Sequence, residues 1–135
     1  MNFPAIEWSE NRYKAWCKNG LYHRDGDLPA LIWQDGRRQW FQNGKLHRDP
    51  ENDLPAVEEP GWVKKWYKNG KIHRGGGLPA IIQILDGLLE WYQNGECYNR
   101  LRVESSTLMK EIVNTNGRDT RVSTFKLKEC SKVGK

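Results

Sequence analysis

Alternating apolar and polar positions around an Asn-Gly step predict a tight β-hairpin in the first half of the chain. Trp-Phe-Gln precedes Asn43-Gly44, and Lys-Leu-His follows it. Asn-Gly favours a two-residue type I′ turn, because both central residues of that turn need a positive φ. Such a turn places Phe41 opposite Leu46 and Trp40 opposite His47. Since strand side chains alternate between faces, one face carries an apolar pair and the other carries Trp opposite His.

The same hairpin pattern recurs four times, which predicts a repeat architecture. The Asn-Gly steps are Asn19-Gly20, Asn43-Gly44, Asn69-Gly70 and Asn94-Gly95. A Trp stands three residues before each step, at Trp16, Trp40, Trp66 and Trp91. A His-Arg pair follows the first three steps, at His23-Arg24, His47-Arg48 and His73-Arg74, and Tyr98-Asn99 replaces it in the fourth. An apolar-Pro-Ala opening completes each copy and gives four units: 3–27, 28–53, 54–77 and 78–102.

The register of the second unit carries over to the other three. The apolar pairs become Cys17–Tyr22, Tyr67–Ile72 and Tyr92–Cys97. The Trp pairs become Trp16–His23, Trp66–His73 and Trp91–Tyr98. A slip of one residue would mix the two sets, so their consistency in all four units supports this register.

A second turn signal precedes each Trp and adds a strand pair to the unit. The signals are Asp35-Gly36, Pro60-Gly61 and Asp86-Gly87, with the weaker Glu10-Asn11 in the first unit. Residues 30–33 and 80–85, before two of these turns, are strand-like. Each unit is therefore expected to be two or three short antiparallel strands, and stacked units bury each other's faces. The fold class predicted is mainly β: an elongated antiparallel meander over residues 1–102 with a C-terminal cap.

The remaining residues, 103–135, do not repeat. Leu108, Met109 and Ile112 fit one face of a short helix after Ser105 or Ser106, with a strand at 122–127 to follow. The alternative is a hairpin turned at Asn116-Gly117 that joins 108–113 to 120–127. The segment is expected to cap the open end of the meander, because that end would otherwise expose a sheet edge.

The repeated pattern resembles a known repeat family. The pattern from Trp40 to Arg48, and again from Trp66 to Arg74, resembles MORN-type repeats. It is closest to a divergent His-Arg-x-x-Gly-Pro-Ala version that recurs in bacterial, bacteriophage and giant-virus proteins. The resemblance covers residues 3–102 and implies an elongated β-meander with a role in binding. Some bacterial relatives of the broader repeat class are labelled antitoxin-like.

Composition and motifs favour a non-enzymatic protein-interaction module. No Ser or Cys stands in a nucleophile motif, and aligned His residues form a row where zinc needs ligands around one centre. No catalytic residue, metal or cofactor is therefore predicted. A net charge of +5 suits an acidic partner, and a phage or viral inhibitor of a host factor, or an antitoxin-like binder, fits the description. The candidate partner-binding residues are of the types enriched at interface hot spots: Trp16, Trp40, Trp66, Trp91, His23, Arg24, His47, Arg48, His73 and Arg74.

Nucleic-acid binding is the alternative function. Aromatic platforms beside cations grip single strands, and the basic tail adds charge. The acids that follow Arg24 and Arg48 oppose this interpretation, because they would pair with Arg and repel phosphate. Arg74 is followed by three Gly, so the sequence predicts that it is freer than the other two.

Location and association state follow from what the sequence lacks. No apolar run approaches the ~20 residues that cross a bilayer, and the N-terminus has no signal-peptide features. A cytoplasmic protein without a membrane partner is expected. Cys17 and Cys97 are predicted to be buried thiols. Exposed sheet edges can pair two copies, so a homodimer is a further expectation.

Overall fold

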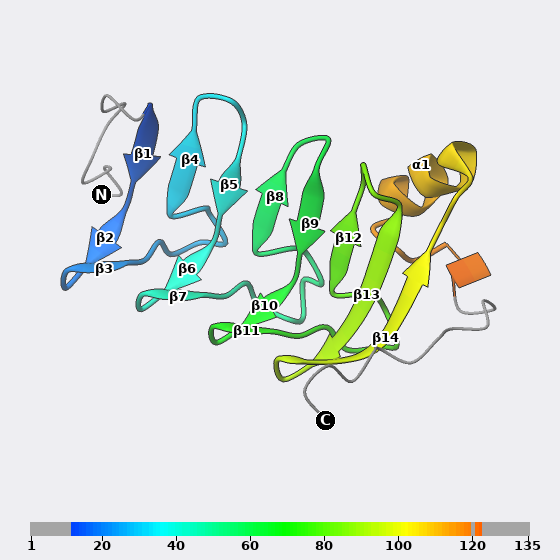
Figure 1. Cartoon of the computed structure of the whole chain (residues 1–135). Coiled ribbons are helices and arrows are strands. Elements are labelled where there is room, and N and C mark those ends of the chain that lie inside the picture. Colours follow the sequence, from blue (N-terminus) through cyan, green and yellow to red (C-terminus); the bar gives the residue numbers. More distant parts are fainter. Residues whose placement is uncertain (1–11, 120, 123–135) are drawn as a thin grey trace.

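The computed structural model describes residues 12–119 and 121–122, which form a long twisted ribbon of antiparallel strands (Figure 1). The first unit gives β1 (Tyr13–Ala15), β2 (Cys17–Lys18) and β3 (Leu21–Tyr22). The second gives β4 (Leu31–Trp33), β5 (Arg38–Gln39), β6 (Phe41–Gln42) and β7 (Lys45–Leu46). The third gives β8 (Val57–Glu59), β9 (Val63–Lys65), β10 (Tyr67–Lys68) and β11 (Lys71–Ile72). The fourth gives β12 (Ile81–Gln83), β13 (Leu88–Gln93) and β14 (Glu96–Arg102), and helix α1 (Ser106–Asn114) follows.

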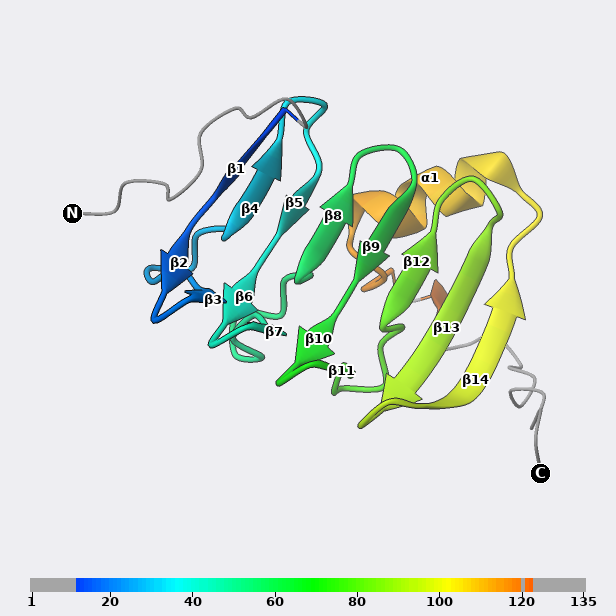
Figure 2. The ribbon, with the colours of Figure 1, turned by 60° about the vertical axis from the view of Figure 1, so that its left-hand side comes forward.

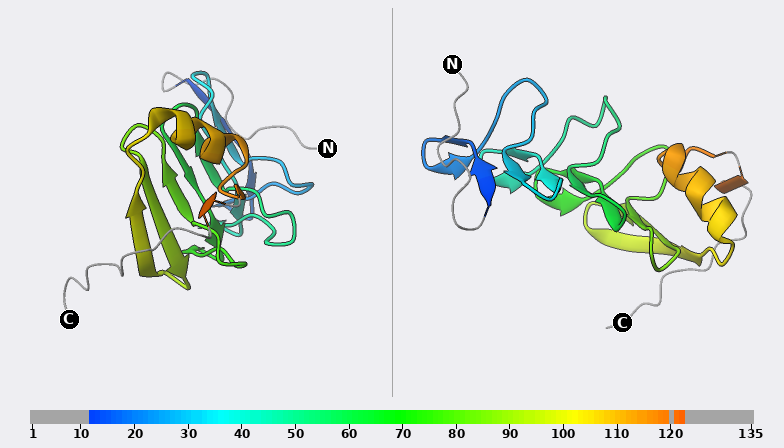
Figure 3. Two further views of the ribbon diagram at one scale, coloured as in Figure 1. Left: turned by 90° about the vertical axis from the view of Figure 1, so that its right-hand side faces the viewer. Right: turned by 90° about the horizontal axis from the view of Figure 1, so that it is seen from above.

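One large sheet runs the length of the ribbon, and small hairpins line its lower side. The large sheet has eight strands in the order β1-β4-β5-β8-β9-β12-β13-β14. The pairs β2-β3, β6-β7 and β10-β11 form separate two-stranded hairpins, which lie in a row in Figure 1. Figure 3 shows the same ribbon end-on and from above, with its long axis plain in the second view. The mainly β, elongated meander predicted from the sequence is confirmed.

The four Asn-Gly steps form the tight turns that the sequence predicts. Their Asn φ angles lie between 49° and 53° and their Gly φ angles between 78° and 87°, as a type I′ turn requires. All four apolar pairs are in the predicted register: Cys17–Tyr22, Phe41–Leu46, Tyr67–Ile72 and Tyr92–Cys97. Positive φ angles at Gly36, Gly61 and Gly87 also confirm the second set of turns, whereas Glu10-Asn11 lies outside the described residues.

The Trp pairing holds in three units and is wrong in the fourth. The N–H of His23, His47 and His73 each donates to the carbonyl of its unit's Trp at 3.0 Å. In the fourth unit a register shift between Trp91 and Tyr92 places Trp91 opposite Asn99, where the sequence predicted Tyr98. A bulge of this kind adds one residue to one strand of the pair.

Successive units are joined at their Trp residues, which places equivalent residues side by side. The N–H of Trp16, Trp40 and Trp66 each donates to the carbonyl of the next unit's Pro-Ala alanine, at 2.8 Å. These alanines, Ala30, Ala56 and Ala80, are completely buried. A larger side chain there would separate the strands at the point where two units meet. The rows of like residues that the repeat predicts therefore exist.

Helix α1 forms where the sequence predicts it, and the alternative hairpin is wrong. Ser105 is the N-cap, and its side chain accepts a hydrogen bond from the N–H of Leu108 at 3.1 Å. Met109 and Ile112 are buried in one cluster with Trp66, Ile82, Leu89, Trp91 and Val103. Figure 2 shows the helix lying against the sheet behind β8 to β13. It covers a face of the sheet, and the cap of the sheet edge expected from 103–135 stays a prediction, because 123–135 lie outside the described residues.

Two other expectations about the chain need correction. Val122 does not start a strand: residues 121–122 are helical, the N–H of Val122 donates to the carbonyl of Asp119 at 2.9 Å, and its side chain joins the core cluster. The rest of the expected strand lies outside the described residues.

Cys17 is an exposed thiol and Cys97 is half-buried and disulfide-bonded, so neither is the buried thiol predicted. The described residues include no helix long and apolar enough to span a membrane.

Candidate interaction surface

The four Trp residues of the repeat are buried and structural. Their exposed fractions lie between 1% and 6%, so they offer no ring face to a partner. The first three lie between a strand of the large sheet and a small hairpin, and Trp91 lies within β13. The indole Nε1 of Trp40 donates to the carbonyl of Asp27 at 3.1 Å, and that of Trp91 to Gly77 at 2.9 Å. Each bond ties a unit to the end of the one before, whereas the buried Nε1 of Trp66 has no partner.

The Arg of each His-Arg pair covers the Trp of its own unit. The guanidinium carbons of Arg24, Arg48 and Arg74 lie 3.6, 3.9 and 3.8 Å from the ring centroids. Nη1 of each Arg donates to the Pro carbonyl that opens the next unit, at 2.9 to 3.1 Å. Each guanidinium therefore makes a cation–π contact with the Trp ring of its own unit. This arrangement holds two units together and leaves no stacking platform for a base.

Ion pairs cross from one unit to the next, which the sequence did not predict. Nε of Arg48 pairs with Asp27 at 2.9 Å, and Nε of Arg74 pairs with Asp53 at 2.8 Å. An acid that follows each of the first two His-Arg pairs thus neutralises the Arg of the following unit. Nε of Arg24 is buried without a partner, and the sequence position that matches Asp27 is Asn2, outside the described residues.

Arg74, which the sequence predicts to be the freest of the three, is the most enclosed. It is 2% exposed, and its Nη1 also donates to the carbonyl of Asn116 at 2.7 Å. Burial lowers the pKa of Arg74, and Asp53 opposes that shift. Burial raises the pKa of Asp53, but Arg74 and Arg118 outweigh it and bring that pKa below its ordinary value. This network fixes the segment after α1 to the third unit.

The three His residues hold the Asn-Gly turn of the next unit. Nδ1 of His23, His47 and His73 accepts from the N–H of Asn43, Asn69 and Asn94, at 2.9 to 3.1 Å. The carbonyl before each His accepts from the Gly N–H of the same turn, at 2.8 Å. Because a backbone N–H can only donate, the ring proton is on Nε2. We call this pair of hydrogen bonds the turn clasp.

The two most exposed large apolar side chains lie on the opposite side, at turns that join paired strands of the large sheet, whereas Leu21, Tyr22, Leu28 and Tyr98 are exposed elsewhere. We call these turns, residues 33–37, 59–63 and 83–87, the turn rim. Trp62 is 59% exposed and Leu85 is 74% exposed. Trp33 is half-buried and lies under the guanidinium of Arg37, whose carbon is 4.8 Å from the ring centroid. The N–H of Arg37 and its guanidinium both bond Asp35 and lower the pKa of that carboxyl.

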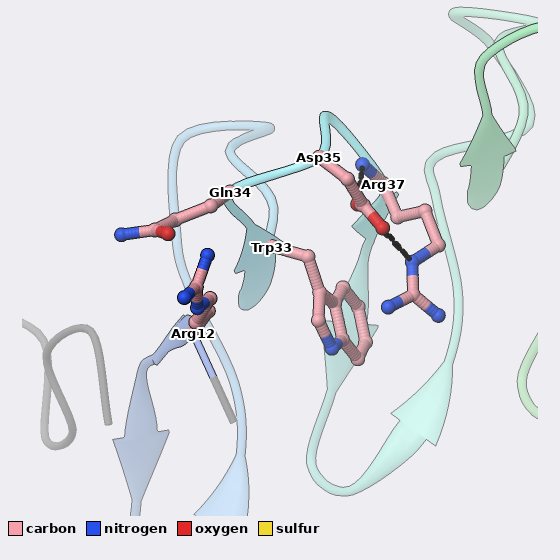
Figure 4. A pocket seen from close by; sticks show the side chains of 5 residues that line it. All are labelled: Arg12, Trp33, Gln34, Asp35 and Arg37. Carbon is pink, nitrogen blue, oxygen red and sulfur yellow. Dashed lines mark hydrogen bonds and ion pairs between the residues drawn. The ribbon is translucent and has the colours of Figure 1, made fainter. Parts of the chain in front are cut away.

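Three hollows follow one another along the turn rim. The first, of about 440 Å³, is lined by Arg12, Trp33, Gln34, Asp35 and Arg37. Figure 4 shows the Trp33 ring between Arg12 on one side and Arg37 on the other. The second, of about 380 Å³, extends from Arg37 to Trp62, and the third, of about 330 Å³, from Trp62 to Leu85. The hollows therefore form a row in which the first two share Asp35 and Arg37 and the last two share Trp62.

The sequence did not single out these rim residues, although a signal for two of them was present. Trp62 directly follows Pro60-Gly61, and Leu85 directly precedes Asp86-Gly87. A large apolar side chain inside a tight turn has no core to enter, so it is an exposed contact residue more often than a core residue. The repeat drew attention to its regular positions, whereas Trp62 and Leu85 lie outside them.

Comparisons of this chain with protein-family models, curated proteins and solved structures found no match. The resemblance to MORN-type repeats therefore stays a prediction from the residues.

Proposed function

We propose that this chain is a non-enzymatic protein-interaction module that contacts its partner through the turn rim. The observation that carries the proposal is the exposure of Trp62 and Leu85 beside three adjoining hollows, the first of which is lined by the half-buried Trp33. Trp and Arg are the residue types that dominate interface hot spots. The Trp, His and Arg rows hold neighbouring units together. The turn rim therefore replaces them as the proposed contact surface.

The turn rim is held rigid before any partner arrives, which supports a role in recognition. The N–H of Gly36 donates to Trp33 at 3.0 Å, and that of Trp62 donates to Glu59 at 2.9 Å. The N–H of Ile84 donates to the carbonyl of Trp62 at 2.7 Å, so two neighbouring turns are tied to each other. A surface that is already ordered loses less conformational entropy on binding.

The partner that fits this surface has apolar side chains at the spacing of the hollows. It has acidic groups where it meets the N-terminal end of the turn rim. Among the residues that the structure describes, Arg12 at that end makes no ion pair, whereas Arg37 is already paired with Asp35. The net charge of +5 favours an acidic protein during approach. A cytoplasmic inhibitor of a host factor, of phage or viral type, or an antitoxin-like binder, belongs to this proposal and rests on the resemblance of the repeats.

Capture from a lysate tests the rim with a matched control. The test variant is Trp62→Ser/Leu85→Ser, and the control is Leu21→Ser, because Leu21 is 49% exposed on the opposite side. Truncation of a hot-spot residue costs at least about 2 kcal/mol, so the double variant should lose a partner that the wild type and the control retain. Equal capture of every partner by all three proteins would show that the turn rim is not the contact surface.

Nucleic-acid binding is a second candidate, and one specific observation favours it. Lys18, Lys45, Lys68 and Lys71 are exposed on the row of hairpins that carry the Asn-Gly turns. Equivalent residues of successive units are two strands apart, roughly 9–10 Å, so this row can follow a phosphate backbone without base stacking. Fluorescence polarisation with single-stranded and duplex oligonucleotides at two salt concentrations tests it. Binding that falls with salt and weakens in Lys45→Gln/Lys71→Gln supports this candidate, and no binding at low salt excludes it.

A further inference from the structure

The chain contains five Asn-Gly dipeptides, and this pair is the most prone of all to spontaneous deamidation. The reaction needs the backbone nitrogen of Gly to reach the side-chain carbonyl carbon of Asn. Gly has no side chain to obstruct that approach. The backbone must leave its turn conformation for the two atoms to meet, so a turn that is held in place reacts slowly. The five sites can therefore be ranked by what holds each turn.

Three of the turns are held by the unit before them. Asn43, Asn69 and Asn94 donate their N–H to a His Nδ1, and the Gly that follows each donates to a carbonyl. Each of these Gly residues also packs against the preceding turn. A Cβ built on Gly44, Gly70 or Gly95 would lie 3.2, 3.6 or 3.9 Å from the side chain there.

The fifth dipeptide, in the segment after α1, is held more firmly still. Asn116 donates its N–H to Val113 at 3.0 Å, and Gly117 donates to Ile112 at 2.8 Å. Oδ1 of Asn116 accepts from Lys64 at 2.6 Å. A Cβ on Gly117 would lie 2.9 Å from the ring of Pro79, which shows how closely the core surrounds it.

The turn of the first unit has none of these restraints. Within the described part of the chain no preceding unit supplies a clasp, and neither Asn19 nor Gly20 makes a hydrogen bond outside its own hairpin. Both residues are exposed, and a Cβ on Gly20 would meet nothing within 4 Å. We propose that Asn19 is a site of spontaneous deamidation in the folded protein and that the turn clasp protects the Asn residues of the other units.

The reaction needs only water as a co-reactant. The backbone nitrogen of Gly20 attacks Cγ of Asn19, loses its proton, and expels the side-chain nitrogen as ammonia to leave a cyclic succinimide. Water then adds to either carbonyl of that ring and opens it. The products are an ordinary aspartyl residue or an isoaspartyl residue, in which the main chain runs through the former side chain. Either product adds one negative charge beside Lys18 at the end of the hairpin row.

Site-resolved mass spectrometry tests this proposal on the full-length protein. The protein is kept folded at mildly alkaline pH and body temperature, and deamidation at each Asn-Gly is followed by peptide mapping with fragmentation that separates aspartyl from isoaspartyl. Two ordinary hydrogen bonds hold each clasped turn, so Asn19 should react at least about tenfold faster than Asn43, Asn69, Asn94 or Asn116. In concentrated urea the five rates should converge, because the turns no longer exist.

A second variant tests whether the clasp is the cause. His47→Phe removes the acceptor of Asn69 alone, so deamidation at Asn69 should rise while that at Asn43 and Asn94 stays at the wild-type rate. The two unchanged sites also report that the variant is folded. The proposal is overturned if Asn19 reacts no faster than the clasped sites, or if the same ranking persists in urea, because local sequence would then set the rates.

Discussion

Each Arg of the three His-Arg pairs lies between the Trp of its own unit and the opening of the next, but the three differ in charge neutralisation. Arg48 pairs with Asp27 and Arg74 with Asp53. Among the described residues, the Arg24 guanidinium has only its Pro carbonyl and its Trp ring as partners. Sequence neighbours suggested that Arg24 and Arg48 pair with the acids just after them and that Arg74 is freer. The actual partner comes from the preceding unit, about 21 residues away, a distance that only the stacked fold makes short.

The pair between Asp53 and Arg74 predicts a dependence of stability on pH. Arg74 and Arg118 hold the pKa of Asp53 below its ordinary value against the opposing effect of burial. A carboxyl with a lowered folded pKa stabilises the fold above its unfolded pKa, about 3.9, and that contribution is lost as pH falls through the folded pKa. Asp53→Asn should therefore cost roughly 3 kcal/mol at neutral pH, with a loss that shrinks as the solution is acidified.

Urea unfolding at several pH values measures this effect, and Asp35→Asn is the matched control. The pair of Asp35 with Arg37 is exposed, so the control should unfold almost as the wild type does at neutral pH. A loss for Asp53→Asn that stays constant from neutral to strongly acidic pH would contradict the charge-based explanation.

The Trp residues of neighbouring units make a second comparison, because their indole nitrogens differ. Nε1 of Trp40 is bonded to Asp27, whereas the buried Nε1 of Trp66 has no partner. Trp→Phe removes similar volume at both sites, but at Trp40 it also leaves a buried carbonyl without its donor. Trp66→Phe should therefore cost about 1 kcal/mol less than Trp40→Phe in urea unfolding. An equal or larger loss for Trp66→Phe would mean that the indole bond is not part of the joint between units.

Among the elements, the hairpins could be predicted from the sequence and the docking of α1 could not. Asn-Gly requires one turn type, and that turn fixes the facing pairs, so four hairpin registers followed from local chemistry. The bulge at Trp91 escaped prediction because nothing local marks it. Helix α1 was marked by Ser105 and by the spacing of Met109 and Ile112, but its amphipathic face does not say which surface of the sheet it covers. The face that it covers carries Ile82 and Leu89, which are completely buried in the cluster with Met109 and Ile112.

The docking of α1 predicts which helix positions matter for stability. Ile112 is completely buried in the cluster with Trp91 and Leu89, so Ile112→Ala should cost about 2–5 kcal/mol. Lys110 is exposed on the same helix, and Lys110→Ala should change stability by no more than about 0.5 kcal/mol. Thermal unfolding of both variants checks this, and similar melting temperatures for the two would contradict the docking.

At the scale of the whole molecule, the repeat separates what holds the ribbon together from what it presents. Trp, Arg and His of one unit bond the carbonyls, carboxylates and turns of its neighbours, so the rows that looked like a binding face are the joints of the array. The turns on the other side, which vary from unit to unit, carry Trp62 and Leu85 into solvent. Regularity in the sequence thus marks the joints, and departure from it marks the surface that a partner can use.

Hydrogen exchange of the indole N–H groups, followed by NMR, tests this separation most directly. The indole N–H groups of Trp40 and Trp91 are bonded to backbone carbonyls inside the joints and should exchange slowly. That of Trp62 belongs to a ring that is 59% exposed and should exchange fastest of the three. Exchange at Trp40 and Trp91 as fast as at Trp62 would show that the rows are open to solvent and would contradict the account.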